Sequence, residues 1–268
     1  MQTKMEGILL AKTPYKERDL IAKILLRSGK KISVVFHGGR GGGKKLKGSV
    51  LELGFMLSFE LNRSNKNHDL HVAKDWNVLW HHQNIRLNHK AFYMLCFYLE
   101  LIQRLAVDDQ LHDEHRDFDR EQEGLFRVLS NALFYLDLNA EAAKFFVHSH
   151  FMNFVGKLLM ELGLFPHRER CGHSDVDLVN ISEMILSPQL GSFAAAQFAD
   201  PELARINPDL GKMGRRLWEE LGPVYHAKYK DMSFDQKIPR ESLMLLFDYL
   251  CYQLNWYQSE FKTLPMIL

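Results

Sequence analysis

Five short apolar runs in the first 75 residues, separated by turn residues, constrain the fold of this chain most strongly. The predicted strands are residues 5–12, 19–27, 31–36, 50–61 and 69–75. Leu57 to Leu61 alternates apolar and polar side chains, as a half-buried strand does. Five short strands in so few residues predict a small barrel of the five-stranded OB type, a fold that commonly binds single-stranded nucleic acid.

After Trp76 the pattern changes to helical spacing. The predicted helices are residues 91–105, 124–138, 140–164 and 239–257. Gly163 is placed to end the third of these helices, and Pro239 to open the fourth as its first residue. The sequence therefore predicts an α+β multidomain protein, with the OB-fold domain in residues 1–80 and an all-α helical domain in residues 81–268.

Composition and length indicate an ordinary globular protein with a large core. No apolar run approaches the roughly 20 residues that span a bilayer, and the N-terminus does not resemble a signal peptide. Three scattered cysteines, Cys96, Cys171 and Cys251, favour a reducing compartment over a disulfide framework. We therefore expect a cytoplasmic protein without a membrane partner.

Charge is divided unequally along the chain. Residues 1–75 hold 15 Lys and Arg against 7 Asp and Glu, a balance of +8, whereas the remaining residues hold 19 against 26, a balance of −7. Such a split indicates two modules with different partners. The concentration is greatest from Arg27 to Lys47, which contains no acidic residue and seven basic ones: Arg27, Lys30, Lys31, Arg40, Lys44, Lys45 and Lys47.

This basic stretch predicts a surface that binds the phosphates of a nucleic acid, because Lys and Arg displace condensed counterions. A solvated face without a ligand is the alternative. Phe36 and His37 adjoin a glycine cluster, residues 38–43, and could stack on bases, although the alternation with Val34 also fits Phe36 into the core.

Gly38 to Lys45 satisfies the spacing of a phosphate-binding P-loop, which leaves a nucleotide-binding ATPase as an alternative function. Lys45, however, replaces the Ser or Thr that binds magnesium, and the following residues predict a strand where a P-loop needs a helix. An OB module that binds RNA is a second alternative. Motifs for nucleophilic catalysis are missing from the sequence, so we expect no catalytic residue and no enzyme activity.

Metal sites are also not expected. The acidic stretch from Asp108 to Glu123 lacks the glycine of a calcium loop and reads as a solvated helix connection, with magnesium binding as the alternative. Cys171 and His173 supply one pair of zinc ligands where a structural site needs four.

Three segments, in order and spacing, resemble the RecO family of bacterial recombination mediators. Glu6 to Leu10 followed by Glu17 to Ile21 is similar to the family's E-G-I-V-L and E-x-D-L-I. Gly29 to Ser33, leading to Gly38-Gly39-Arg40, is similar to G-K-I-S and K-G-A-R. Phe154 to Pro166, with Cys171 eight residues past Gly163, resembles F-x-x-R-L-L-x-x-L-G-x-x-P and the first cysteine after it.

The resemblance implies binding of single- and double-stranded DNA, annealing of complementary strands, and loading of recombinase on DNA coated with single-stranded DNA-binding protein (SSB). It implies RecR and the C-terminal tail of SSB as partners, the RecA filament as an indirect partner, a nucleoid-associated location, and no cofactor. Zinc-bearing members have four cysteines near Cys171, so one cysteine here implies a degenerate, zinc-free region at about 168–198.

The predicted DNA-binding residues are Arg27, Lys30, Lys31, Phe36, His37, Arg40, Lys44, Lys45 and Lys47. An SSB tail is acidic with aromatic residues, so its pocket should combine a basic residue with apolar walls. The basic candidates are Arg127, Lys157, Arg215 and Arg216, and the sequence does not choose among them.

Overall fold

The computed structural model describes residues 4–40, 50–61, 70–109, 124–142 and 144–268. The chain forms two compact units, Met1–Ala142 and Ala143–Leu268, which are treated separately below. The structure has no helix, among the residues it describes, of the length and apolar character needed to cross a bilayer.

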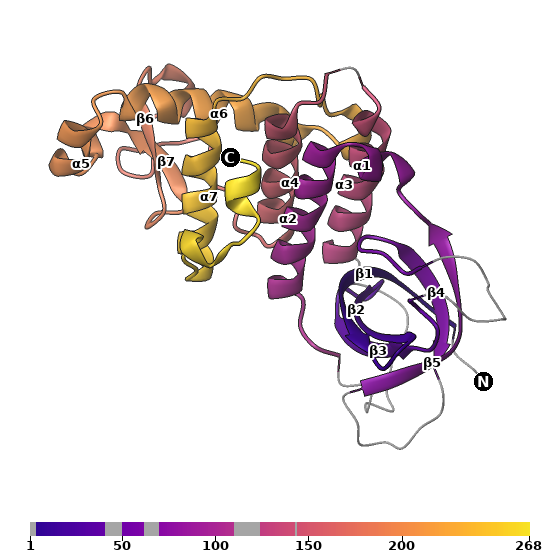
Figure 1. The fold of residues 1–268 in the computed structure, drawn as a ribbon. Helices are drawn as coiled ribbons and strands as arrows, with labels where there is room; N and C mark the ends of the chain where they lie inside the picture. The colour runs from indigo at the N-terminus through magenta and orange to yellow at the C-terminus, as the bar shows by residue number, and fades with distance from the viewer. Residues whose placement is uncertain (1–3, 41–49, 62–69, 110–123, 143) are drawn as a thin grey trace. The chain divides into compact units, whose positions relative to one another are not determined.

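A closed five-stranded barrel forms the start of the first unit (Figure 1). Its strands are β1 (Lys4–Tyr15), β2 (Asp19–Leu26), β3 (Lys31–Phe36), β4 (Met56–Leu61) and β5 (Leu70–Trp80). Around the barrel the order is β1-β2-β3-β5-β4, and β1 closes it by pairing with both β2 and β4. All pairs are antiparallel except β3 with β5, which are parallel. The predicted OB-type barrel followed by a helical region is confirmed.

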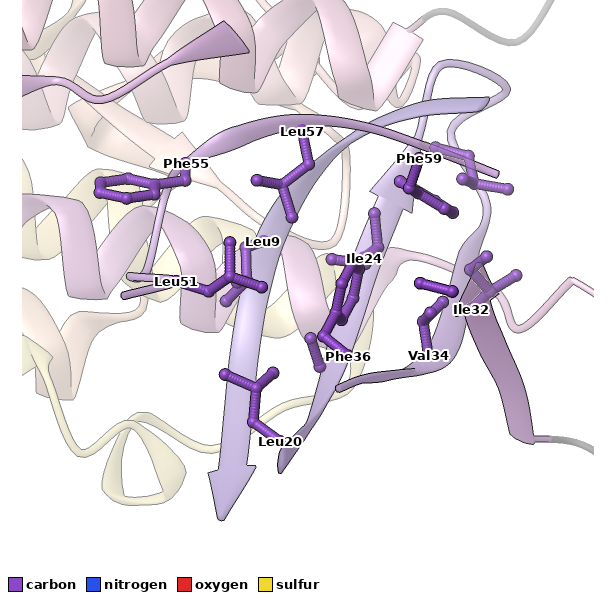
Figure 2. Packing of buried hydrophobic residues seen from close by; sticks show 13 residues of the cluster. Leu9, Leu20, Ile24, Ile32, Val34, Phe36, Leu51, Phe55, Leu57 and Phe59 are labelled. Atoms are coloured by element: carbon purple, nitrogen blue, oxygen red, sulfur yellow. The ribbon is translucent and has the colours of Figure 1, made fainter. Parts of the chain in front are cut away.

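Alternating apolar side chains fill the barrel interior, as Figure 2 shows for Leu20 and Ile24 of β2 and Val34 and Phe36 of β3. These side chains are buried, because residues two apart on a strand point to the same face. The Phe36 ring meets the rings of Phe59 and Trp76 edge to face, at centroid distances of 5.9 and 6.0 Å. The core of the barrel is therefore closed by aromatic contacts between three of its strands.

The prediction of one strand over residues 50–61 is wrong in its first half, because β4 begins only at Met56. Leu51 and Phe55 are buried, but the backbone between them turns at Gly54, where φ is +77°. The amide of Gly54 donates to the carbonyl of Leu9 at 2.8 Å. An apolar run therefore packs into the core here without extending a strand.

The described residues of the first unit also form three helices: α1 (Gln83–Leu87), α2 (His89–Leu105) and α3 (Gly124–Ala140). The side chain of Asn88 caps α2 by accepting from the amides of Lys90 and Ala91. Arg86 links α1 to the barrel, since its Nη2 donates to the carbonyl of Leu53 at 2.5 Å and its guanidinium lies over the Phe55 ring. The predicted end of the OB-fold domain, residue 80, coincides with the end of β5. That this residue is a domain boundary stays a proposal.

The second unit is built on α4 (Val147–Glu161), α6 (Leu210–His226) and α7 (Arg240–Leu254). A two-stranded antiparallel sheet, β6 (Met184–Ser187) with β7 (Ser192–Ala195), packs on α6, and the short α5 (Pro201–Ile206) precedes α6 in the chain. Single 3-10 turns cover Leu178–Asn180, Ala196–Phe198, Tyr229–Asp231, Gln258–Glu260 and Leu264–Met266. The helical region thus includes one small sheet that the sequence analysis did not predict.

The helix predicted over residues 140–164 is shorter, because Ala140 ends α3 and α4 begins only at Val147. Its predicted end is right: Gly163 has a φ of +68°, and the amides of Gly163 and Leu164 donate to the carbonyls of Met160 and Leu159. These two bonds form a Schellman motif, which satisfies carbonyls that a helix end leaves open. Pro239 precedes α7 as its N-cap instead of serving as its first residue.

Candidate nucleic-acid interface

The turn that follows β3, residues 37–40, is fixed to the hairpin loop between β1 and β2. The carboxylate of Asp19 accepts from the amide of Gly38 at 3.0 Å and lies 2.8 Å from Nδ1 of His37. These hydrogen bonds from Gly38 and His37 lower the pKa of Asp19, so the group is a carboxylate at neutral pH. His37 is exposed, as expected for a residue that contacts a ligand, but it is already in contact with an acidic group.

Arg40 lies on the same turn and is exposed. Its Nη1 donates to the carbonyls of Lys16 and Glu17 at 3.3 and 3.2 Å, and its amide donates to the carbonyl of Arg18 at 3.1 Å. Among the described residues its guanidinium contacts no carboxylate, so its charge is available to a phosphate. That Arg40 binds DNA stays a prediction.

The other described cations of the basic stretch have partners inside the fold. Arg27 lies 2.7 Å from the carboxylate of Glu6 and over the ring of Phe126. Lys30 pairs with Asp109 at 3.6 Å. Lys31 donates from Nζ to the carbonyl of Gln103 at 2.9 Å. The prediction that these three bind DNA stays open: carboxylates pair with the charges of Arg27 and Lys30, whereas Lys31, like Arg40, contacts a carbonyl.

Phe36 has no exposed surface, so the prediction that its ring stacks on bases is wrong. Its side chain points into the barrel with the other even-numbered residues of β3, and the alternative of a core position holds. Lys44, Lys45 and Lys47 lie outside the described residues, so their role stays a prediction.

Three exposed residues that the sequence analysis missed lie in the hairpin between β1 and β2: Tyr15, Lys16 and Arg18. Lys16 adopts a φ of +53°, and its Nζ lies 5.2 Å from the centre of the Tyr15 ring. Neither Lys16 nor Arg18 forms an ion pair with any residue that the structure describes. Their alternation with Glu17 and Asp19 hid them in the sequence, because the local net charge is near zero.

A shallow pocket of about 200 Å³ opens beside this hairpin. Its lining residues are Lys12, Thr13, Pro14, Leu20, Arg40, Val50 and Leu51. Leu20 and Leu51 are buried and belong to the barrel core, and both are labelled in Figure 2. Lys12 donates to the carbonyl of Leu51 at 3.0 Å and pairs with Glu52 at 2.7 Å. The pocket thus combines an apolar floor with two cationic residues.

The four residues predicted to bind a protein partner are not equivalent. Arg127 is exposed on α3, in the first unit. Lys157 is half-buried and donates to the carbonyl of Ala227 at 2.6 Å, and burial lowers its pKa. Arg215 contacts three carbonyls, at Leu178, Val179 and Ile181, and lies over the ring of Trp218.

Arg216, the fourth candidate, pairs with Glu220 one turn away on α6, at 3.2 Å, but its side chain remains largely exposed. Lys157 and Arg215 therefore support the fold of the second unit, whereas Arg127 and Arg216 present their side chains to solvent. Nothing in the structure tests whether any of the four binds a partner.

The region predicted to be a degenerate zinc site contains the small sheet and a buried cysteine. Burial acts to raise the pKa of the Cys171 thiol, but hydrogen bonds from Ser174 and from backbone amides outweigh it and lower the pKa to about 7. The ring of His173 stacks on Phe198 at 4.8 Å. Across the described part of the chain, no group of three or more His, Cys, Asp or Glu residues is arranged to hold a metal ion.

Comparison with known protein families identifies the N-terminal domain. Residues 1–79 match the family model described as recombination protein O N terminal (RecO_N). The matched residues end one residue before the end of β5 and so coincide with the barrel. A comparison with curated proteins gave no match. The barrel domain is therefore similar to the N-terminal domain of the RecO recombination-repair proteins.

Proposed function

We propose that this protein is a DNA-binding recombination mediator, which anneals complementary single strands and helps load recombinase on SSB-coated DNA. The observation that supports this proposal most directly is the RecO_N match over the closed barrel. We further propose that it performs this work without catalytic turnover or a cofactor, in the cytoplasm and in association with the nucleoid.

A strand of DNA would cross the end of the barrel where the β1–β2 hairpin meets the turn after β3. Arg40, Lys16 and Arg18 would contact its phosphates there, and Lys44, Lys45 and Lys47 follow Arg40 in the sequence. Two complementary strands repel each other through their phosphates. Cations that neutralise this charge lower the barrier to their approach, which is the physical basis of annealing.

We also propose RecR and the SSB tail as protein partners, and the RecA filament as an indirect partner. The exposed side of α3 favours Arg127 as the basic residue of the SSB-tail site. Phe134 and Leu138 follow Arg127 at helical spacing and are 42% and 59% exposed, so a cation and two apolar side chains share one face. An acidic peptide with aromatic residues fits such a face.

A strand-annealing assay on naked and SSB-coated DNA, run at two salt concentrations, tests the main proposal. We expect the protein to accelerate annealing of both substrates, more strongly at the lower salt concentration. If the protein does not accelerate annealing of the naked DNA, or does not accelerate annealing of the SSB-coated DNA, the proposal is refuted. Failure of an SSB-tail peptide to bind the protein would instead refute only this partner.

The role of the lysines after Arg40 is tested by the salt dependence of DNA affinity. Replacing Lys44, Lys45 and Lys47 by Ala should flatten the slope of log affinity against log salt by about 2, at about 0.7 per phosphate contact on a single strand. The matched control replaces Arg27 and Lys30, whose charges are paired with Glu6 and Asp109. If the control loses as much slope for each cation removed, Arg27 and Lys30 bind DNA as well, and the loop lysines have no special role.

The two alternative functions have direct tests. Residues 50–55 contain no helix and lead into β4, but residues 44–49, where a P-loop ATPase opens its helix, lie outside the described residues. ATP turnover stimulated by DNA would establish that alternative. Tighter binding of RNA than of a DNA strand of the same sequence would favour an RNA-binding module.

A further inference from the structure

We propose that the pocket between the β1 end and Val50 binds one unpaired base of the DNA strand. This inference rests on the proposed function and specifies which form of DNA its site selects. The pocket lies entirely within the barrel unit. Leu20 and Leu51 form its floor, Pro14 and Val50 its apolar sides, and Lys12 and Arg40 its cationic edges.

The floor of the pocket is held in place by the barrel core. The amide of Leu51 donates to the carbonyl of Gly39 at 3.0 Å, which ties the segment before β4 to the turn after β3. A Cβ at Gly39 would lie 3.0 Å from the side chain of Leu20, so the glycine permits this close approach. Leu20 and Leu51 are both buried, so the barrel core holds the floor of the pocket in place.

Its size indicates a small, flat ligand. A volume of about 200 Å³ is below the roughly 300–1,000 Å³ of sites that enclose whole drug-sized molecules. The pocket is therefore suited to one heterocycle whose polar edge stays in water. A base inside a duplex is stacked on both faces and paired at its edge, so only an unpaired, unstacked base can enter.

The cationic lining residues favour a base that is attached to a phosphate backbone over an uncharged apolar ligand. Arg40 uses one guanidinium nitrogen for its two carbonyl contacts, and its other nitrogens make no hydrogen bond to the described residues. Arg40 and Val50 also flank, in sequence, the segment that contains Lys44, Lys45 and Lys47. A strand held by Lys12 and Arg40 would pass the mouth of the pocket, so that its sugar and phosphate stay outside while a base enters.

The test compares intact and abasic DNA bound to the full-length protein. Fluorescence anisotropy would measure the affinity of a labelled oligothymidylate of about 12 nucleotides, within the usual site size of an OB fold, and of the same strand with every base removed. We expect the intact strand to bind about tenfold more tightly, a ratio that corresponds to about 1.4 kcal/mol. The variant Val50→Asn should lower this ratio to below about three, because a polar group replaces an apolar wall.

Leu79→Asn is the matched control: Val50 and Leu79 are 45% and 49% exposed, but Leu79 does not line the pocket. The control should keep the tenfold ratio. Both substitutions are uncharged, so the salt dependence of affinity should stay as in the unmodified protein. If the unmodified protein binds intact and abasic strands with equal affinity, the proposal that the pocket binds a base is refuted, but the proposal that the protein binds DNA is not. No binding of either strand would overturn the proposed function itself.

Discussion

His82 should make the stability of the barrel unit depend on pH, and the structure allows the size of this effect to be calculated. The residue joins β5 to α1, adopts a φ of +48°, and packs its ring 4.3 Å from that of Trp80. It is 3% exposed, and its Nδ1 has no hydrogen-bond partner within the described chain. Burial, and then the charges of Arg86 and His81, lower its pKa to about 4.

In the unfolded chain a histidine has a pKa of about 6.5. Between these two values the unfolded state binds more protons than the folded state, so stability falls as pH falls. A folded-state pKa of about 4 predicts that lowering the pH from 7 to 5 removes roughly 1.5–2 kcal/mol through this residue alone. The loss begins near pH 6.5 and is complete only below the folded-state pKa.

The substitution His82→Asn removes this titration, and Asn tolerates a left-handed backbone. Urea unfolding of both proteins at pH 7, 6 and 5 would measure the difference in unfolding free energy. Replacing Trp218 and Trp256 by Phe in all samples leaves Trp76 and Trp80 as fluorescent reporters of the barrel unit. We expect the difference between the two proteins to change by roughly 1.5–2 kcal/mol from pH 7 to pH 5.

A matched variant, His89→Asn, replaces an exposed histidine of the same unit and should not reproduce that change. Parallel pH dependence in the unmodified protein and in His82→Asn would refute the reasoning, since it would mean that His82 is as easily protonated in the fold as in the unfolded chain.

The remaining predictions concern the barrel rim and the packing. Replacing Lys16 and Arg18 by Ala should flatten the salt dependence of single-strand binding by about 1.4, from two phosphate contacts at about 0.7 each; an unchanged slope would remove the hairpin from the interface. Phe36→Ala should lower the free energy of unfolding by about 3–5 kcal/mol, as expected for a buried Phe; chemical unfolding that shows less than 1 kcal/mol would contradict its core position. Gly214→Ala should prevent stable folding of the second unit, because its Cβ would lie 1.9 Å from the carbonyl oxygen of Met184. The control Gly163→Ala, which has open space but a φ of +68°, should cost only about 1 kcal/mol in thermal unfolding.

Local pattern was sufficient for four of the five barrel strands and for the helices α2, α3 and α7, but it did not predict α6. β2 and β3 were predicted nearly to their observed ends, since alternation and turn residues are properties of neighbouring residues in the chain. The start of α4 was not predicted correctly, because the residues from Glu141 to Phe146 are also compatible with a helix. Only tertiary packing decides where one helix ends and the next begins.

The candidate site depended far more on distant contacts. Arg27 and Lys30 look equivalent to Arg40 in the sequence, but Glu6 and Asp109, far away along the chain, neutralise the first two. Lys16 and Arg18, which seem balanced by their acidic neighbours, form no ion pair with a described residue, in part because Asp19 turns toward His37 and Gly38.

The sequence by itself determined that an OB-type barrel comes first, that helices follow, and that positive charge concentrates in the barrel, because strand alternation, helical spacing and net charge are local quantities. Only the tertiary structure decided which of those charges face solvent and that an apolar pocket lies beside Arg40, because charge pairing and burial depend on residues that the chain brings together from a distance.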